Sequence, residues 1–327
     1  MLLESFSPIG QQANAAWNEN APQNRKTLLL HALPALALPI LISAINLFLD
    51  GQLANTGGLS GIGMRSTLET IQTVLSSAIR ILLPFWQLGL FYIAIQISRG
   101  TAGRPQHLFE GFRRWGSALR LMLLRAIRYF SKLFLGLLLG SLLYSILPLS
   151  SNLTKVIEEI SKDPAFSQVS ADVLMAEITS RLGFWDLALQ YGFCLLFAGI
   201  LTVPLFYHYR MSDYALLDSE KPGAFQALQE STSLMHGNRV RLFKLDLQFW
   251  WYYLLTLLAT ATSYGDLILP FLGIQLPTSK EWAYMIFALI SATLHFILYY
   301  LFRGQVETTY ACVYNALKAS QGGSETL

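Results

Sequence analysis

The chain has 327 residues, of which 53% are hydrophobic and 13% are charged, whereas about a quarter of the residues are charged in an average soluble domain. This composition excludes a disordered chain, and the formal net charge of +3 is too small for a nucleic-acid-binding protein. Apolar residues are spread along the whole chain, which indicates that its solvent is a lipid bilayer. The two cysteines, Cys194 and Cys312, cannot form a disulfide framework.

A helix needs about 20 mostly apolar residues to cross the hydrocarbon core of a bilayer. Residues 27–49 are the clearest candidate, because they contain no Asp, Glu, Lys or Arg and are too long for the apolar part of a signal peptide. In chain order, the predicted spans are residues 27–49, 71–97, 127–149, 187–209, 245–264 and 282–302. The sequence therefore predicts an all-α, polytopic transmembrane bundle of about six spans in a single membrane domain, residues 1–327.

The placement of Lys and Arg predicts the orientation of the spans. Leaving aside Arg120, Arg125 and Lys244 next to the predicted spans, the termini and loops on one side carry 12 Lys and Arg residues, against 5 on the other side, and the basic side faces the cytoplasm. Residues 1–26 are then a cytoplasmic interfacial helix and residues 303–327 a cytoplasmic tail. The loop at residues 150–186 faces outward, and its apolar residues recur at helical spacing, which predicts a helical loop.

A three-part pattern occurs three times in the sequence. Each copy consists of an amphipathic helix that begins at a proline, a turn that contains Lys or Arg (the basic corner), and a span that leads outward. The three copies begin at Pro8, Pro105 and Pro222. Proline suits the first turn of a helix, and an amphipathic helix with a cationic end lies in the headgroup layer. The pattern predicts parallel internal repeats, as in some transporters. The alternative is that basic, amphipathic loops are common to all multispan proteins.

The third copy is similar to a bacterial integral-membrane family of unknown function. The signature of that family reads A-L-x-E-S-x-x-L-M-x-G-x-K/R-x-x-L-F-x-L-D-L-S-F, and residues 227–249 follow it, with Gln248 where the family usually has Ser. Residues 98–112 resemble an earlier segment of the same family. The resemblance implies a multi-pass protein of the bacterial plasma (inner) membrane, and it implies no activity.

Charged residues inside the spans or at their ends are the candidate functional residues. Four of them lie on one helix within an arc of about 140°, at 100° per residue. These four are Arg120, Arg125, Arg128 and Lys132. This basic stripe is interpreted either as a positive-inside anchor or as a contact site for anionic lipid headgroups or a phosphate ligand. The residues predicted to contact lipid or ligand, with that stripe in the middle, are Arg113, Arg114, Arg120, Arg125, Arg128, Lys132, Arg239 and Arg241.

Other intramembrane residues carry separate hypotheses. Asp246 needs a cationic partner at membrane depth. When the second and third copies are aligned, Arg125 and Asp246 occupy equivalent positions. We therefore hypothesise that Arg125 and Asp246 form an ion pair. Arg80 and His208 are candidates for lining a transport path, and the alternatives are a snorkelling arginine and a structural histidine. The histidines of the spans lack metal-ligand spacing, so we expect neither a metal site nor a cofactor.

Gly136 and Gly140 form a face of small residues on the third predicted span. Such a face lets two helix backbones approach closely. It predicts helix packing within the bundle, with dimerisation as the alternative. The sequence does not otherwise indicate the oligomeric state.

The sequence contains no nucleophile–base arrangement, phosphate-binding glycine loop or paired intramembrane carboxylates, so we do not expect an enzyme. Two hypotheses remain. In the first, the protein is a non-catalytic component of envelope assembly or export that binds the anionic lipids of the bilayer or a membrane protein partner. In the second, it is a small transporter or channel on parallel repeats, in which Pro84, Pro204 and either Pro34 or Pro39 break the spans beside a central path.

Overall fold

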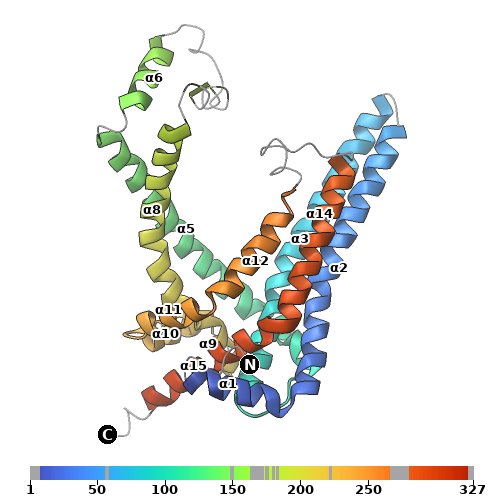
Figure 1. Cartoon of the computed structure of the whole chain (residues 1–327), viewed down its shortest axis with the longest axis vertical. Coiled ribbons are helices and arrows are strands. Elements are labelled where there is room, and N and C mark those ends of the chain that lie inside the picture. Colours follow the sequence, from blue (N-terminus) through green and yellow to red (C-terminus); the bar gives the residue numbers. More distant parts are fainter. Residues whose placement is uncertain are drawn as a thin grey trace. The chain divides into compact units, whose positions relative to one another are not determined.

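The computed structural model describes residues 8–55, 59–147, 151–162, 184–220, 223–265 and 280–322, together with Val173, Glu177, Ile178 and Arg181. Almost all of these residues are helical, and none of them lies in a β-strand, so the predicted all-α class is confirmed (Figure 1). The chain forms two compact units. Unit 1 comprises Met1–Leu119 and Met211–Leu327, and unit 2 comprises Arg120–Arg210.

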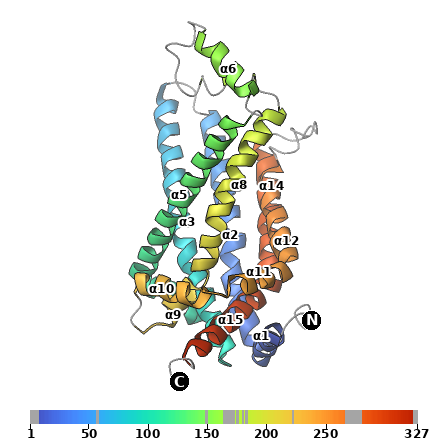
Figure 2. The same ribbon diagram turned by 90° about the vertical axis from the view of Figure 1, so that its left-hand side faces the viewer.

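The first part of unit 1 is built around two long helices. Its elements are α1 (Pro8–Glu19), α2 (Ala21–Asn55), α3 (Leu59–Ser98), the 3-10 turn η1 (Pro105–Phe109), α4 (Glu110–Arg113) and the start of α5 (Trp115–Ile146). Figure 2 shows α2 between α3 and α14, and α2 packs against both. Two of the predicted interfacial segments begin at their prolines, because α1 starts at Pro8 and η1 starts at Pro105.

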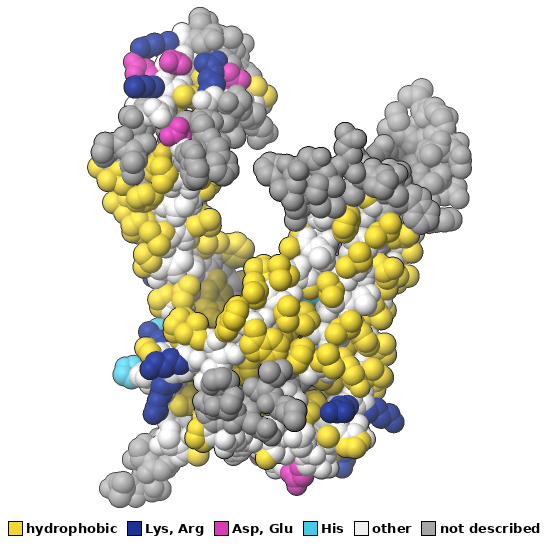
Figure 3. All heavy atoms as spheres, in the orientation of Figure 1, with side chains coloured by type: hydrophobic (Ala, Val, Ile, Leu, Met, Phe, Trp, Pro, Cys, Tyr) yellow, Lys and Arg dark blue, Asp and Glu magenta, His cyan; other side chains and the backbone are white. Residues whose placement is uncertain are grey.

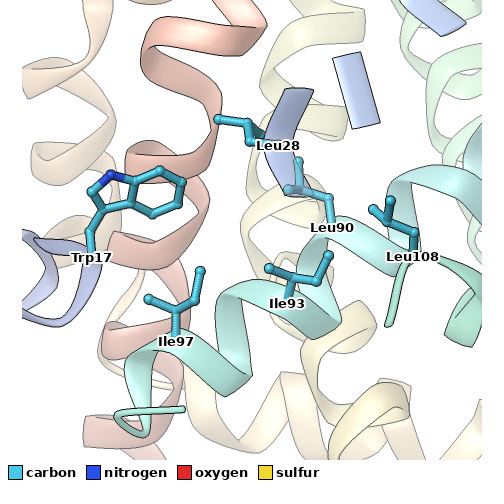
Figure 4. Packing of buried hydrophobic residues seen from close by; sticks show 6 residues of the cluster. All are labelled: Trp17, Leu28, Leu90, Ile93, Ile97 and Leu108. Carbon is cyan, nitrogen blue, oxygen red and sulfur yellow. The ribbon is translucent and has the colours of Figure 1, made fainter. Parts of the chain in front are cut away.

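The apolar core of this part joins four elements. Figure 4 shows its six residues on the facing sides of α1, α2, α3 and η1: Trp17, Leu28, Leu90, Ile93, Ile97 and Leu108. Gly89 allows the close approach of η1 to α3, because a Cβ atom at this position would lie 2.1 Å from the Leu108 carbonyl oxygen. Thr27 Oγ1 donates a hydrogen bond to the Gly103 carbonyl at 2.8 Å, which fixes the loop after α3 against α2.

The second part of unit 1 contains shorter helices and one long one. Its elements are α9 (Ser212–Asp218), α10 (Ala224–Met235), α11 (Arg239–Gln248), α12 (Trp250–Thr262), α14 (Lys280–Leu298), the π-helical turn η4 (Tyr299–Arg303) and α15 (Gly304–Gly322). Pro222, where the third predicted copy begins, lies outside the described residues. The segment predicted as a tail forms α15, and most residues of its first half are buried.

Unit 2 contains α5 from Arg120 onward, α6 (Ser151–Lys162) and α8 (Phe184–Tyr209). Its two long helices lie side by side (Figures 1 and 2). A Cβ atom on Gly136 would lie 2.5 Å from the Cα atom of Ala198, and one on Gly140 would lie 2.6 Å from that of Cys194. The small-residue face therefore packs α5 against α8, as the sequence predicts. Of the loop at residues 150–186, the described residues include α6, which confirms helix there.

Within the described residues, five helical segments are long and apolar enough to cross a membrane: Ala21–Ile42, Ser77–Ser98, Trp115–Ile146, Ala188–Asp218 and Met285–Gln321. These overlap five of the six predicted spans. The predicted span at residues 245–264 is not a single helix, because α11 ends at Gln248 and α12 begins at Trp250. The 13 residues of α12 rise about 20 Å. The sixth span and the internal repeat therefore remain predictions.

Candidate functional site

The core of unit 1 contains a buried ion pair on one side of a helix. Arg303 Nη2 lies 2.9 Å from Glu307 Oε1, and the Glu307 side chain is only 2% exposed. Residues four apart face each other on a helix, which explains the local geometry. Desolvation of two charges is costly, so such a pair requires good geometry and further hydrogen bonds.

Two tyrosines supply these hydrogen bonds from other elements. Tyr214 on α9 donates its hydroxyl to Glu307 Oε2 at 2.8 Å, and Arg303 Nη1 donates to the Tyr252 hydroxyl on α12 at 3.5 Å. We call Tyr214, Tyr252, Arg303 and Glu307 the buried charge cluster. Arg303 is the last residue of the π-helical turn η4, a type of distortion that is frequent at functional sites.

His31 lies on α2, which contacts the turn η4 that ends at Arg303. Its ring is stacked on the indole of Trp86, with the ring centroids 5.9 Å apart, and is almost fully buried. Among the described residues, no hydrogen-bond partner is present for either ring nitrogen of His31 or for Arg303 Nε. Since buried polar atoms usually have partners, these atoms can each bind one further polar group.

A row of polar side chains continues from the cluster along α15. Tyr310 donates to Asp246 on α11, and Tyr314 donates to Glu230 on α10 at 3.0 Å. Near the end of the row, Lys318 Nζ lies 2.7 Å from Asp218 Oδ2. α15 is thus joined through hydrogen bonds and ion pairs to α9, α10 and α11.

Asp218 also binds Arg99, at the end of α3. Arg99 Nη1 lies 2.7 Å from Asp218 Oδ1, and the hydrogen bond to Asp218 raises the pKa of the Arg99 guanidinium. Asp218 therefore accepts from two cations, Arg99 in the turn after α3 and Lys318 on α15.

The predicted contact residues of unit 1 have different environments. Arg114 donates to the carbonyl oxygens of Leu216 and Ser219, both at 2.8 Å, and so caps the end of α9. Arg113 pairs with Glu110 at 2.6 Å, but its side chain is 74% exposed. Arg241 is exposed on α11, and Arg239 is half-buried at the start of the same helix. Arg114 is therefore engaged within unit 1, whereas Arg113 and Arg241 face outward.

The predicted stripe of unit 2 is partly engaged within that unit. Arg120 and Lys132 are exposed, and Arg125 is half-buried. Arg128 donates to the hydroxyl of Tyr209 on α8, and its guanidinium lies 5.3 Å from the centre of the same ring. α5 thus turns one of its basic residues toward α8.

The remaining predicted residues stay hypotheses. Arg125 belongs to unit 2 and Asp246 to unit 1, and the predicted pair between them remains untested. His208 is half-buried on α8 beside Tyr209, while the side chain of Arg80 lies outside the described part of the structure. Among the described residues, no three His, Cys, Asp or Glu side chains are grouped as metal ligands would be.

Arg303 and Glu307 are not among the residues that the sequence singles out, because they lie in the segment predicted as a cytoplasmic tail. Their opposite charges, four residues apart, are the signal that could have predicted a helix here. That signal does not distinguish a buried pair from an exposed one, since exposed pairs are far commoner.

The model of a family described as "Protein of unknown function (DUF975)" matches residues 23–321 of this chain. Comparisons with curated proteins and with solved structures found no match.

Proposed function

The chain belongs to the DUF975 family, whose function is unknown, and we propose that it is a non-catalytic integral membrane protein that binds lipid or a membrane protein partner in envelope assembly or export. We place it in the bacterial plasma membrane with six spans, parallel internal repeats and both termini in the cytoplasm. We also propose that residues 1–327 form a single membrane domain and that residues 227–249 carry the signature of the family.

One observation carries this proposal: the long helices expose apolar side chains that water would not solvate. On α5, Ile127, Phe130 and Phe134 are at least 65% exposed, and on α8 Leu195 is 67% exposed. Contiguous apolar surface of this kind requires lipid or a protein partner. In Figure 3, yellow apolar side chains likewise cover much of the visible face of α12 and α14.

The topology is tested with single cysteines in a chain whose Cys194 and Cys312 are replaced by Ala. We expect that an impermeant thiol reagent does not label Ser5→Cys or Gly322→Cys in intact cells and labels both in inverted vesicles. Labelling of either position in intact cells would contradict the proposed orientation.

The binding role is tested by extraction of the protein together with its surrounding lipids in polymer nanodiscs. We expect anionic phospholipids to be several-fold enriched over their fraction in the bulk membrane, because the basic residues attract their headgroups. A lipid composition equal to that of the bulk membrane would contradict lipid binding, and the remaining role would then be that of binding a protein.

The buried charge cluster favours a second candidate function, a small transporter or channel. Arg303 directly follows the predicted span at residues 282–302, and buried ionisable residues in or beside spans commonly mark ion or substrate pathways. If the cluster lines such a path, a cysteine in place of Tyr252 reacts with a water-soluble thiol reagent, whereas Leu258→Cys on the exposed side of α12 does not. If neither position reacts in reconstituted protein, the cluster is structural and the first function stands.

A further inference from the structure

α11 (Arg239–Gln248) has three distinct faces. At 100° per residue, Leu242 and Leu245 lie within an arc of about 60°, and both are buried. The next arc carries the exposed side chains of Arg241 and Lys244. Most surface helices have one buried and one polar face, so the third face of α11 is the feature that needs an explanation.

The third face is apolar and exposed. It consists of Val240, Phe243 and Leu247, which are 64%, 47% and 53% exposed. These residues follow the spacing i, i+3 and i+7, so they form one continuous stripe within an arc of about 60°. The apolar stripe lies directly beside the basic arc of Arg241 and Lys244.

The only carboxylate of α11 is turned toward the protein. Asp246 accepts a hydrogen bond from the hydroxyl of Tyr310 on α15. Asp246 therefore does not lie between the two basic side chains, and the outward side of α11 combines two positive charges with an apolar stripe. Its charge is complementary to an anionic surface.

The helix direction changes immediately after α11. Phe249 separates α11 from α12, and its N–H donates to the Asp246 carbonyl at 3.0 Å. Figure 1 shows α12 rising from this point while α11 lies across its lower end. A helix that lies across the start of a membrane helix is positioned for the headgroup layer.

We propose that α11 lies in the plane of the membrane surface, with Val240, Phe243 and Leu247 among the lipid acyl chains and Arg241 and Lys244 bound to the headgroups of anionic phospholipids. This inference rests on the proposed function, since it requires the protein to be inserted in a bilayer. It names α11 as the element that binds lipid and an anionic phospholipid bilayer as its partner.

The position of α11 is tested with a fluorescent thiol label on Leu247→Cys, in full-length protein with Cys194→Ala and Cys312→Ala, reconstituted in phosphatidylcholine vesicles that contain a minor fraction of phosphatidylglycerol. We expect brominated acyl chains to quench this label and aqueous iodide not to. A label on Gln229→Cys, on the exposed side of α10, is the matched control and should show the reverse. Quenching of the Leu247→Cys label by iodide would overturn the inference.

The headgroup preference is tested in the same vesicles, with bromine on the phosphatidylglycerol alone. Quenching of the Leu247→Cys label should report a local phosphatidylglycerol fraction about fivefold above the bulk fraction. Arg241→Gln with Lys244→Gln should reduce this enrichment to near unity without changing quenching by brominated phosphatidylcholine. Lys155→Gln with Lys162→Gln, on α6, should leave it unchanged. Unchanged enrichment in the α11 variant would overturn the headgroup assignment.

A third label separates failure of this inference from failure of the proposed function. Leu294→Cys lies on the exposed side of α14. If lipid quenches the label there while iodide quenches the α11 label, the protein is inserted and only the position of α11 is wrong. If iodide quenches both labels, membrane insertion itself is contradicted.

Discussion

Units 1 and 2 hold their helices together in different ways. In unit 1, α15 is joined to α9, α10 and α11 by tyrosines, carboxylates and cations. In unit 2, α5 meets α8 where Gly136 and Gly140 bring the two backbones into contact. Apolar side chains gain little by leaving lipid for one another, so membrane helices associate through close packing and hydrogen bonds. Both means occur in each unit, since Gly89 lets η1 approach α3 in unit 1 and Arg128 donates to Tyr209 in unit 2, but the contacts of α15 are mainly polar and the contact of α5 with α8 at Gly136 and Gly140 is a close backbone contact.

The two means have different vulnerabilities. A polar network depends on each partner, because a buried charge that loses its counterpart is strongly unfavourable. A close backbone contact depends on the absence of side-chain volume and is lost when a methyl group is added. The four predictions below test this difference, from the largest expected effect to the smallest.

Arg303→Leu should have the largest effect on unit 1. It leaves the Glu307 carboxylate, which is 2% exposed, without its cation, and we expect the free energy of unfolding to fall by about 3–5 kcal/mol. The measurement is an unfolding titration in mixed detergent micelles. The matched control is Arg113→Leu, which breaks the exposed pair with Glu110 and should cost about 1 kcal/mol or less. Equal losses in the two variants would contradict the structural importance of the buried pair.

Tyr214→Phe removes one hydroxyl and keeps the ring. Glu307 then loses the hydrogen bond that it accepts at 2.8 Å, and hydrogen bonds to charged groups are worth about 1.5–3 kcal/mol. We expect a loss of this size in the same titration. Tyr191→Phe, at an exposed position on α8, serves as the control and should be nearly neutral.

Gly140→Ala tests unit 2. The added Cβ would lie 2.6 Å from the Cα atom of Cys194, so α5 and α8 must move apart, at a cost of about 1–3 kcal/mol. Gly199→Ala is the control, because no atom outside its own helix backbone and its chain neighbours lies within 4 Å of the added Cβ. This control should be neutral or slightly stabilising, since Ala favours helix. If both variants behave alike, close packing at Gly140 does not hold unit 2 together.

His107 should give the smallest effect, because it is only half-buried in η1. Burial, together with the cation of Arg104, lowers the pKa of His107 below its ordinary value of 6.5, and Glu110 acts in the opposite direction. The folded state therefore binds the proton more weakly than the unfolded state. This contribution to stability is present above pH 6.5 and is lost as the pH falls through the lowered pKa.

The measurement compares the unfolding of the unmodified chain and of His107→Gln between about pH 7.5 and about pH 5. We expect the unmodified chain to lose more stability than the variant as the pH falls. Identical pH profiles would show that His107 does not contribute.

The sequence predicted those features that depend on local composition. Hydropathy placed five of the six predicted spans on helices of suitable length, and the spacing of Gly136 and Gly140 predicted helix packing within the bundle, which the structure shows between α5 and α8. The break at Phe249 was not predicted, because hydropathy averages over residues 245–264, and the sixth span stays a prediction. The helix α15 was not predicted either, because many of its residues are polar like those of a cytoplasmic tail.

The candidate site shows the same division. The basic residues predicted to contact lipid were chosen by charge and position, and Arg241 is exposed as that role requires. Arg114 has the same charge but is bound to the carbonyl groups at the end of α9. No local pattern distinguishes the two arginines, because the carbonyl groups that bind Arg114 lie about 100 residues further along the chain.

The sequence by itself determined that this protein is helical and rich in segments that are apolar enough to cross a membrane, because each peptide group or charge that is exposed to lipid carries its own free-energy cost. Only the tertiary structure decided which polar residues are buried and which apolar residues are exposed. Burial of Glu307 requires Tyr214 and Arg303 to lie beside it, and the orientation of Asp246 toward α15 requires the hydroxyl of Tyr310. Such pairings join residues far apart in the chain, so they become visible only when the helices are packed.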